Sequence, residues 1–445
     1  MSNKCKIFRK ENKQSGITLV ALVVTIVVLL ILAGISIRLV LDNNGIINRA
    51  GEAKDKHEQG RVNDQTDLSS VEDYLDEVMS GIKKIDGVPI PNGYYYVGGT
   101  KDTGFVISDS SEDENKYKEA EDGKVLKDNL VGNQWVWVPV DDEMLAKMCN
   151  TANTTEYKMC GTTDGNPVKA KWYSSSATLS GETITRTTPG ATRGYREPDL
   201  VVGNHGESYD VKDYKTIVSD NGTLKEMAQL FKDEYETMIK SVQKYKGFYI
   251  GRYELSGSVD NPTEQSGTTI TNTNWYDLYN ACKKLGANAD GSDKEGIATR
   301  MIWGCQWDAT CDFIATKGET KSITDSKTWG NYDNSDGDAA VKETKEDGTE
   351  EDKYGSKQIT GYSEYWKANN IYDIAGNCNE WTQEANESNL RAYRGGCYSV
   401  SGFSYPASCR HGAGYPTSNS DRARYSSHFN NYNWHLECEN QWKKI

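Results

Sequence analysis

Cysteine and histidine are the residues of this sequence whose side chains most readily supply catalysis or metal binding. The ten cysteines include three close pairs, none with the C-x-x-C spacing of a zinc site: Cys149/Cys160, Cys305/Cys311 and Cys397/Cys409. Four of the five histidines have no Ser or Cys nucleophile motif nearby: His205, His411, His428 and His435. The spacing therefore favours neither structural zinc nor nucleophilic catalysis, and it leaves the pairing of the cysteines open.

Recognition is the chemistry that the C-terminal residues favour instead. Residues 397–433 are rich in Tyr, Ser, Asn, Gly, His and Arg, and their apolar residues follow a period of neither two nor 3.6. Tyr supplies rigid amphipathic contact area, and Ser, Gly and Asn supply adaptable hydrogen bonds. A glycine- and serine-rich structural loop has a similar composition and stays open as an alternative.

The same residues use a restricted set of amino acids. No Lys, Glu, Gln, Met or Trp occurs in residues 397–433. Changing the adenines of an Asn codon, AAC or AAT, gives most of the residues that do occur, but never a stop codon and never those five types. This is the pattern expected of codons that are rewritten at their adenines.

Residues 372–381, which precede this region, have the features of a rigid support. Asp373, Gly376 and Asn377 are turn formers, and they alternate with packing residues. We interpret Glu380 and Trp381 as a structural turn and a core Trp rather than as the site of a general acid.

Local sequence patterns predict the strands and helices of the domain to which residues 372–381 belong. Alternating aromatic and aliphatic residues predict strands at 93–97, 134–139 and 247–253. Helical spacing of apolar residues predicts helices at 224–242 and 275–285, the second with one face formed by Trp275, Leu278, Tyr279 and Cys282. The polar segments 149–213 and 322–358 are interpreted as loops. Together these elements predict an α+β domain with many loops.

The charge of the chain excludes one class of partner. The net charge is −14 and the pI is near 5.0, so no basic surface is expected that would hold nucleic acid. Acidic runs that begin at Ser110 and Val341 are interpreted as solvated loops. The chain has 27 Tyr and 11 Trp against 7 Phe, which favours a folded binding domain with half-exposed rings.

The N-terminal residues predict a membrane anchor. Residues 17–37 are uncharged and apolar over a length that crosses a bilayer, and five basic residues precede them. The positive-inside rule places the N-terminus in the cytoplasm and the rest of the chain outside the cell. This segment resembles the leader of type IV pilin-like proteins, which implies cleavage by a prepilin peptidase between Gly16 and Ile17. Ala21 stands where that family carries Glu, which argues against a filament subunit.

Four regions follow from these patterns. We expect a basic leader at 1–16, a pilin-like transmembrane helix at 17–41, a helical stalk at 42–84 and a large outer domain at 85–445.

The outer domain resembles the formylglycine-generating enzyme, or sulfatase-modifying factor, family. Six segments occur in that family's order: GFYIGRYE from Gly247, WYDLYNACKKL from Trp275, ATRMIWGCQWDATCDFI from Ala298, TWGNYD from Thr328, NNIYDIAGNCNEW from Asn369 and YRGG from Tyr393. The resemblance implies a C-type-lectin-like fold. The family's closing G-F-R would fall at residues 433–435, where this sequence departs from it.

The enzymatic chemistry of that family is not expected here. Its two active-site cysteines would fall at Val400 and Tyr405, and Val cannot form a thiolate or bind copper(I). The resemblance also implies structural calcium sites near the GN-x-x-EW segment, for which Asn377 is the candidate ligand. No other cofactor is expected.

Some members of this fold family resemble the variable proteins of diversity-generating retroelements, in which reverse transcription rewrites template adenines near the 3′ end of the gene. This resemblance implies a surface-displayed protein that binds an unknown protein or glycan on another cell or virus. The candidate contact residues are Tyr398, Ser399, Ser401, Phe403, Ser404, Tyr405, His411, Tyr415, Asn419, Asp421, Arg422, Tyr425, His428, Asn430, Asn431, Tyr432 and Asn433. The alternatives are a pilin-like structural or adhesive protein of fixed specificity and a formylglycine-generating oxidase.

Overall fold

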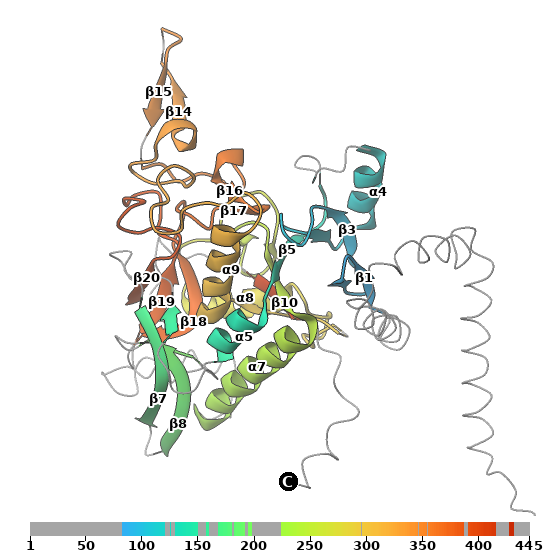
Figure 1. The fold of residues 1–445 in the computed structure, drawn as a ribbon, viewed down its shortest axis with the longest axis vertical. Helices are drawn as coiled ribbons and strands as arrows, with labels where there is room; N and C mark the ends of the chain where they lie inside the picture. Colours follow the sequence, from blue (N-terminus) through green and yellow to red (C-terminus); the bar gives the residue numbers. More distant parts are fainter. Residues whose placement is uncertain are drawn as a thin grey trace, which may run out of the picture. The chain divides into compact units, whose positions relative to one another are not determined.

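The computed structural model describes one unit, Leu75–Ile445, over part of its length (Figure 1). The described residues are 82–120, 125, 130–149, 157–159, 168–179, 182–191, 195–197, 224–294, 296–345, 347–353, 355–386, 390–414 and 427–430. They form a mixture of helices and strands, which confirms the predicted α+β class. None of their helices combines the length and apolarity that a bilayer crossing requires. The predicted leader, the membrane helix and most of the stalk lie outside the described residues.

A hairpin begins where the stalk region was expected to end. Lys83 and Lys84, the last residues assigned to the stalk region, lie in strand β1 (Lys83–Ile85), and β1 pairs with β2 (Val88–Ile90). Asp86 and Gly87 connect the two strands with φ of 52° and 78°. An Asp-Gly pair favours this two-residue turn, and the turn fixes the hairpin.

A six-stranded antiparallel sheet forms the centre of the unit. Its order is β13-β21-β10-β5-β4-β3, with bounds Ala298–Met301, Ser427–Asn430, Gly247–Gly251, Gln134–Pro139, Val106–Ser108 and Tyr95–Gly98. The strands predicted at 93–97, 134–139 and 247–253 are confirmed within one or two residues at their ends. Strand β21, from the C-terminal region, lies between β10 and β13.

Alternation along β5 explains why the sheet is buried on both faces. Val136 and Val138 pack into the larger apolar core, whereas Trp135 and Trp137 pack into a second cluster on the opposite face. Successive side chains of a strand point to opposite faces, so the run WVWV supplies apolar contact to both.

Three helices complete the larger core. They are α7 (Leu224–Tyr245), α8 (Trp275–Lys284) and α9 (Gly304–Thr316). Asn274 caps α8 by accepting a hydrogen bond from the backbone N–H of Asp277. The predicted apolar face of α8 is confirmed, since its four residues have no exposed surface: Trp275, Leu278, Tyr279 and Cys282.

A second sheet has seven strands in the order β20-β19-β18-β9-β8-β7-β6. Their bounds are Arg410–Gly414, Leu390–Arg394, Glu380–Asn386, Tyr195–Arg196, Glu182–Ala191, Val168–Leu179 and Tyr157–Met159. The interpretation of 149–213 as loops is therefore wrong, because β7 and β8 form a long hairpin there. Their Ser- and Thr-rich sequences lack an apolar alternation, and backbone pairing to neighbouring strands defines them instead.

The two acidic runs are also ordered. The first contains helix α4 (Ser111–Ala120), where buried Asp113 accepts hydrogen bonds from the Ser108 hydroxyl and the N–H groups of Val131 and Gly132. The second forms an exposed hairpin of β14 (Val341–Thr344) and β15 (Glu350–Lys353), which Figure 1 shows projecting from the unit. Cross-strand ion pairs such as Lys353–Glu343 support the hairpin. Opposite charges on the two strands thus favour pairing here, which net charge alone does not reveal.

The remaining short elements connect these layers. They are α5 (Asp142–Cys149), β11 (Ser256–Gly257), β12 (Pro262–Thr263), η5 (Gly337–Ala339), η6 (Glu364–Trp366), β16 (Lys367–Ala368) and β17 (Ile371–Tyr372).

Gly376 is expected to tolerate no side chain. Its φ is +79°, and a Cβ there would lie 2.1 Å from the carbonyl oxygen of Asn331. Left-handed strain and a backbone clash together should make Gly376→Ala destabilising by about 2–4 kcal/mol, measured by urea unfolding. Gly348 is the matched control, since its φ is +81° but a Cβ there would have no atom within 4 Å. Equal losses for Gly376→Ala and Gly348→Ala would show that the close approach to Asn331 does not matter.

Candidate binding face

A buried turn at residues 373–377 supports two surface loops, one that precedes it in the chain and one that follows it. Asp373 and Asn377 have φ of 60° and 55°, and neither has exposed surface. The backbone N–H of Asn377 donates to the carbonyl of Asn331 at 2.8 Å, and its carbonyl accepts from the N–H of Tyr398 at 2.9 Å. Asn377, a predicted turn former, therefore joins two loops that are distant in the chain. This agrees with its predicted role in a rigid support.

The side chain of Asn377 is fully used inside the protein. Its Nδ2 donates to both carboxylate oxygens of Glu254 at 2.8 Å, and its Oδ1 accepts from Asn331 Nδ2 at 2.9 Å and from the N–H of Gln358 at 3.0 Å. An amide oxygen has two lone pairs, and both are engaged. Asn377 therefore does not fit the expected calcium ligand. Within the described part of the chain, no group of three or more His, Cys, Asp or Glu could hold a metal ion.

Residues 398–405 form a loop whose backbone is held in place from several sides. The N–H of Gly402 donates to Asn334 Oδ1 at 2.8 Å, and its carbonyl accepts from the N–H of Ser326 at 3.0 Å. The amide of Asn334 in turn donates to the Ser401 hydroxyl at 3.1 Å. On this fixed backbone the side chain of Phe403 is 62% exposed.

The candidate contact residues of this loop are all at least partly exposed. Ser399 and Phe403 are exposed, and Tyr398, Ser401, Ser404 and Tyr405 are half-buried. The positions expected for catalytic cysteines, Val400 and Tyr405, belong to the same loop. The cysteines on either side, Cys397 and Cys409, are buried thiols and not a disulfide.

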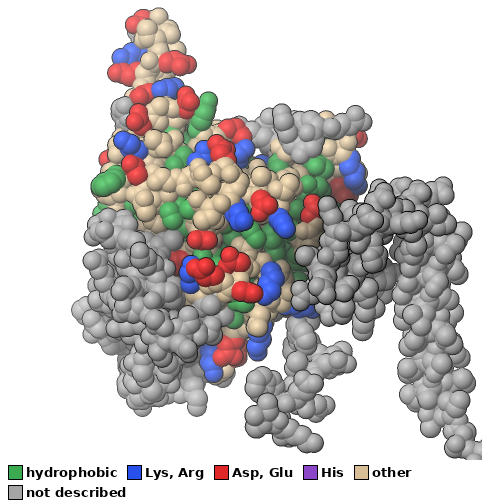
Figure 2. Space-filling view, in the orientation of Figure 1, with side chains coloured by type: hydrophobic (Ala, Val, Ile, Leu, Met, Phe, Trp, Pro, Cys, Tyr) green, Lys and Arg blue, Asp and Glu red, His purple; other side chains and the backbone are tan. Residues whose placement is uncertain are grey.

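Two further loops adjoin residues 398–405 and were not predicted as part of the site. Residues 333–338 contact it through Asn334, and residues 356–365 approach it where Asn377 bonds both Gln358 and Tyr398. The second loop exposes Ile359, Tyr362 and Tyr365 by 48%, 47% and 53%. We call the surface of residues 333–338, 356–365 and 398–405 the loop face. Figure 2 shows hydrophobic, acidic and basic side chains interspersed over the visible side of the molecule.

A weak signal for the second loop is present in the sequence. Residues 359–365 contain two Tyr, one Ser and one Gly, residue types that favour recognition in 397–433, but they lie more than thirty positions away along the chain. Only folding brings the two segments together.

Residues 406–410, in contrast, are buried beneath the loop face. The carbonyl of Ala407 accepts a hydrogen bond from the indole N–H of Trp307 on α9 at 2.9 Å. Arg410 has no exposed surface. The predicted recognition region is therefore divided into an exposed loop and a core segment.

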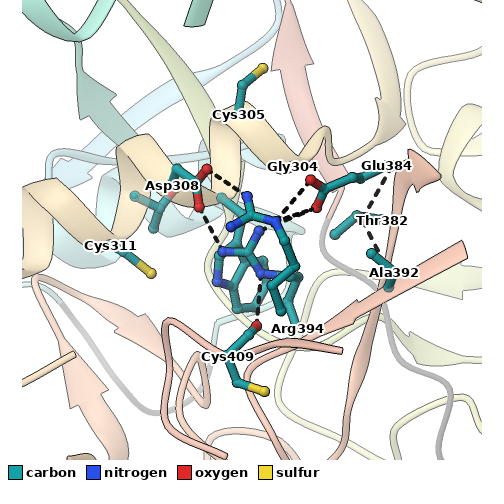
Figure 3. Close-up of polar contacts among 12 residues, drawn as sticks. Gly304, Cys305, Asp308, Cys311, Thr382, Glu384, Ala392, Arg394 and Cys409 are labelled. Carbon is teal, nitrogen blue, oxygen red and sulfur yellow. Dashed lines mark hydrogen bonds and ion pairs between the residues drawn. The ribbon is translucent and has the colours of Figure 1, made fainter. Parts of the chain in front are cut away.

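Arg410 belongs to a buried network of two cations and two anions. Its Nε donates to Glu384 Oε1 at 2.8 Å, and its Nη2 donates to Asp308 Oδ2 at 2.6 Å. Arg394 also donates to Asp308, at 2.7 Å, and to the carbonyl of Cys409 at 2.8 Å. Figure 3 shows Asp308, Glu384 and Arg394 converging from a helix and two strands. The network links α9, β18, β19 and β20 below the loop face.

A third carboxylate, that of Glu197, lies at the first turn of α9. It accepts hydrogen bonds from the backbone N–H groups of Gly304 and, at 3.0 Å, Cys305. The same space borders Glu384, because a Cβ on Gly304 would lie 2.6 Å from an oxygen of each carboxylate. Burial, followed by the negative charge of Glu384, raises the pKa of Glu197 to about 8. Burial and the neighbouring carboxylate therefore favour the protonated form of Glu197, which joins the segment after β9 to the core.

The other predicted contact residues are divided between two strands and the undescribed part of the chain. His411 lies in β20, and His428 and Asn430 lie in β21. Pairing with β19, β10 and β13 imposes strand geometry on two segments of residues 397–433, although their sequence shows no apolar period of two. The residues that fall outside the described part are Gly16, Ile17, Tyr415, Asn419, Asp421, Arg422, Tyr425, Asn431, Tyr432 and Asn433.

Comparisons with known proteins assign no family to the chain. No protein-family model and no curated protein matches it. Among solved structures it is similar to Treponema denticola variable protein 1, with 12% sequence identity over 62% of this chain and 99% of that one, and a TM-score of 0.24. The functional argument therefore depends on the loop face itself.

Proposed function

We propose that the protein binds a ligand through the loop face and displays that face outside the cell. The observation that carries this proposal is the 62% exposure of Phe403 on a loop fixed by hydrogen bonds to Asn334 and Asn377. A large apolar ring on a rigid loop offers contact area at a small cost in conformational entropy when a partner binds. Exposed rings of this kind supply much of the binding energy at protein surfaces.

The rest of the proposal concerns the way the face is presented. The outer domain would have a C-type-lectin-like fold of the formylglycine-generating type, without that family's oxidase activity, since Val400 and Tyr405 replace the thiols. The apolar helix at 17–41 would anchor it in the membrane after a prepilin peptidase cuts behind Gly16, with the N-terminus in the cytoplasm. The proposal requires no cofactor, and it includes no nucleic acid among the partners.

We further propose that a retroelement diversifies the face at adenines. The restricted alphabet of residues 397–433 supports this, and so does the exposure of Ser399 and Phe403, whose replacement leaves the core intact. The buried residues 406–410 would be excluded from variation, because their packing and ion pairs allow few replacements.

Deep sequencing of the gene's 3′ end in a population of source cells tests the diversification. We expect substitutions in codons for residues 398–405, at positions where a nearby near-copy of the sequence has adenine. Codons for residues 406–410 are the internal control and should stay constant. A uniform 3′ end without a near-copy would overturn diversification and leave a binder of fixed specificity or a pilin-like surface protein.

A further inference from the structure

The loop face combines exposed rings with an excess of negative charge. Its charged residues are exposed and comprise four acids and one base: Asp333, Asp336, Asp338, Glu364 and Lys357. Asp336 and Glu364 have basic neighbours, Lys327 at 4.0 Å and Lys367 at 2.6 Å. Among the described residues, no Lys or Arg lies within ion-pair distance of Asp333 or Asp338. The face thus presents charge that its own side chains leave uncompensated.

Continuous contacts join the acids to the rings. Residues 326–339 bond Gly402 and Ser401 at one end, through Ser326 and Asn334. At the other end the carbonyl of Ala339 accepts from the indole N–H of Trp366 at 2.8 Å. The Trp366 ring in turn packs against Tyr362, with ring centroids 5.4 Å apart. The acidic segment therefore lies between the exposed loop 398–405 and the exposed rings of 359–365.

The loop 356–365 lies outside the residues with the restricted alphabet, so its side chains would stay constant while 398–405 vary. Contact residues that stay constant beside contact residues that vary can bind a chemical group that all ligands share. Here that set is apolar and aromatic, through Ile359, Tyr362 and Tyr365, next to the carboxylates of Asp333 and Asp338. Aromatic rings attract Lys and Arg through their faces, and carboxylates attract them by charge.

We propose that the ligand is a protein that presents Lys or Arg beside apolar side chains, and that Tyr362, Tyr365, Asp333 and Asp338 form the constant half of its site. This rests on the proposed function of the loop face. A neutral glycan has no positive charge to compensate the carboxylates, and an anionic one is repelled by them. A protein partner with a basic and apolar surface matches both the charge and the rings.

A random peptide library displayed on phage and selected on the full-length wild-type chain provides defined probes for the test. We expect the selected peptides to be enriched in Lys or Arg next to aromatic or aliphatic residues. Binding of a selected peptide should weaken at least about tenfold in Tyr362→Ser/Tyr365→Ser and in Asp333→Asn/Asp338→Asn, and the aspartate effect should shrink in ~1 M salt. Asp260→Asn/Asp290→Asn removes the same charge from loops beside α8 and should leave the affinity unchanged.

The variants distinguish a failure of this inference from a failure of the proposed ligand-binding function on which it rests. If Phe403→Ser abolishes binding while the Tyr362/Tyr365 and Asp333/Asp338 variants bind normally, the loop face binds ligand but has no constant half. If none of these variants changes binding, the loop face is not the site and both proposals fail. Selection of acidic peptides, or binding only to a glycan array, would overturn the proposed class of partner. Unchanged thermal unfolding of each variant ensures that these outcomes report binding.

Discussion

Replacing Arg410 by Ala should lower the free energy of unfolding by about 3–5 kcal/mol. The guanidinium of Arg410 has no exposed surface and donates to both Glu384 and Asp308. Removing it leaves two buried carboxylates with Arg394 as their remaining cation, and an uncompensated buried charge costs far more than a surface pair contributes. Urea unfolding followed by circular dichroism measures the loss.

Two variants make this result specific to the buried network. Arg410→Lys keeps the charge but loses the forked geometry, so it should be intermediate between wild type and Arg410→Ala. Lys342→Ala breaks a partly exposed ion pair with Asp352 on the β14–β15 hairpin and should cost about 0.5 kcal/mol or less. A loss below about 1 kcal/mol for Arg410→Ala would mean that the network does not hold α9 to the second sheet.

This prediction also bears on diversification. Arg is among the residues that adenine changes in an Asn codon produce, so composition alone places Arg410 among the variable positions. Its burial makes it a fixed residue within the region. Variation there would disrupt the layer that supports residues 398–405, and selection for a folded face would remove it.

The stability of the domain should fall as pH rises from about 5 to about 8, with a slope of up to about 1.4 kcal/mol per pH unit from Glu197 alone. Burial and the charge of Glu384 raise the pKa of Glu197 from 4.5 to about 8 in the folded state. Between those two values the folded state binds a proton that the unfolded state lacks. Stability therefore decreases as pH increases through this range, and below pH 4.5 the contribution is fully present.

Glu197→Gln is the variant that tests this linkage. The Gln side chain has nearly the shape of the protonated acid and is neutral at every pH. Gly304 and Cys305 donate to different oxygens of Glu197, so Gln keeps an acceptor for one of these two N–H groups and places its NH2 at the other. Because Gln cannot ionise, we expect the stability of this variant to depend less steeply on pH than that of wild type, measured by urea unfolding at intervals from about pH 5 to about pH 9. Asp290→Asn, at an exposed site, should leave the wild-type slope unchanged. A parallel slope in Glu197→Gln and wild type would assign the pH dependence to other groups.

Local patterns predicted the elements whose residues interact mainly with their neighbours in the chain. Alternation in WVWV identified β5, and helical spacing identified the buried face of α8. Strands β7 and β8 were missed because their sequences are polar and backbone pairing defines them. The segment of β15 was missed because charged residues suggest solvation, although here they pair with opposite charges across the hairpin.

The candidate site was predicted only in part, for a related reason. Composition singled out the whole of residues 397–433, so it gave no reason to distinguish Phe403 from Arg410. The structure exposes the first and buries the second. It also brings Tyr362 and Asp333 to the same face, which their separation in the chain concealed.

The sequence by itself determined the elements with strong local periods, the turn formers at 373–377, the net acidity and the restricted alphabet of residues 397–433. Each of these follows from residues close together in the chain, where backbone preference and spacing act directly. The tertiary structure alone decided which of those residues face solvent and which carboxylates surround Arg410. Burial and ion pairing depend on groups such as Asp308 and Glu384, which lie 102 and 26 positions away, and only the folded chain brings them within hydrogen-bond distance.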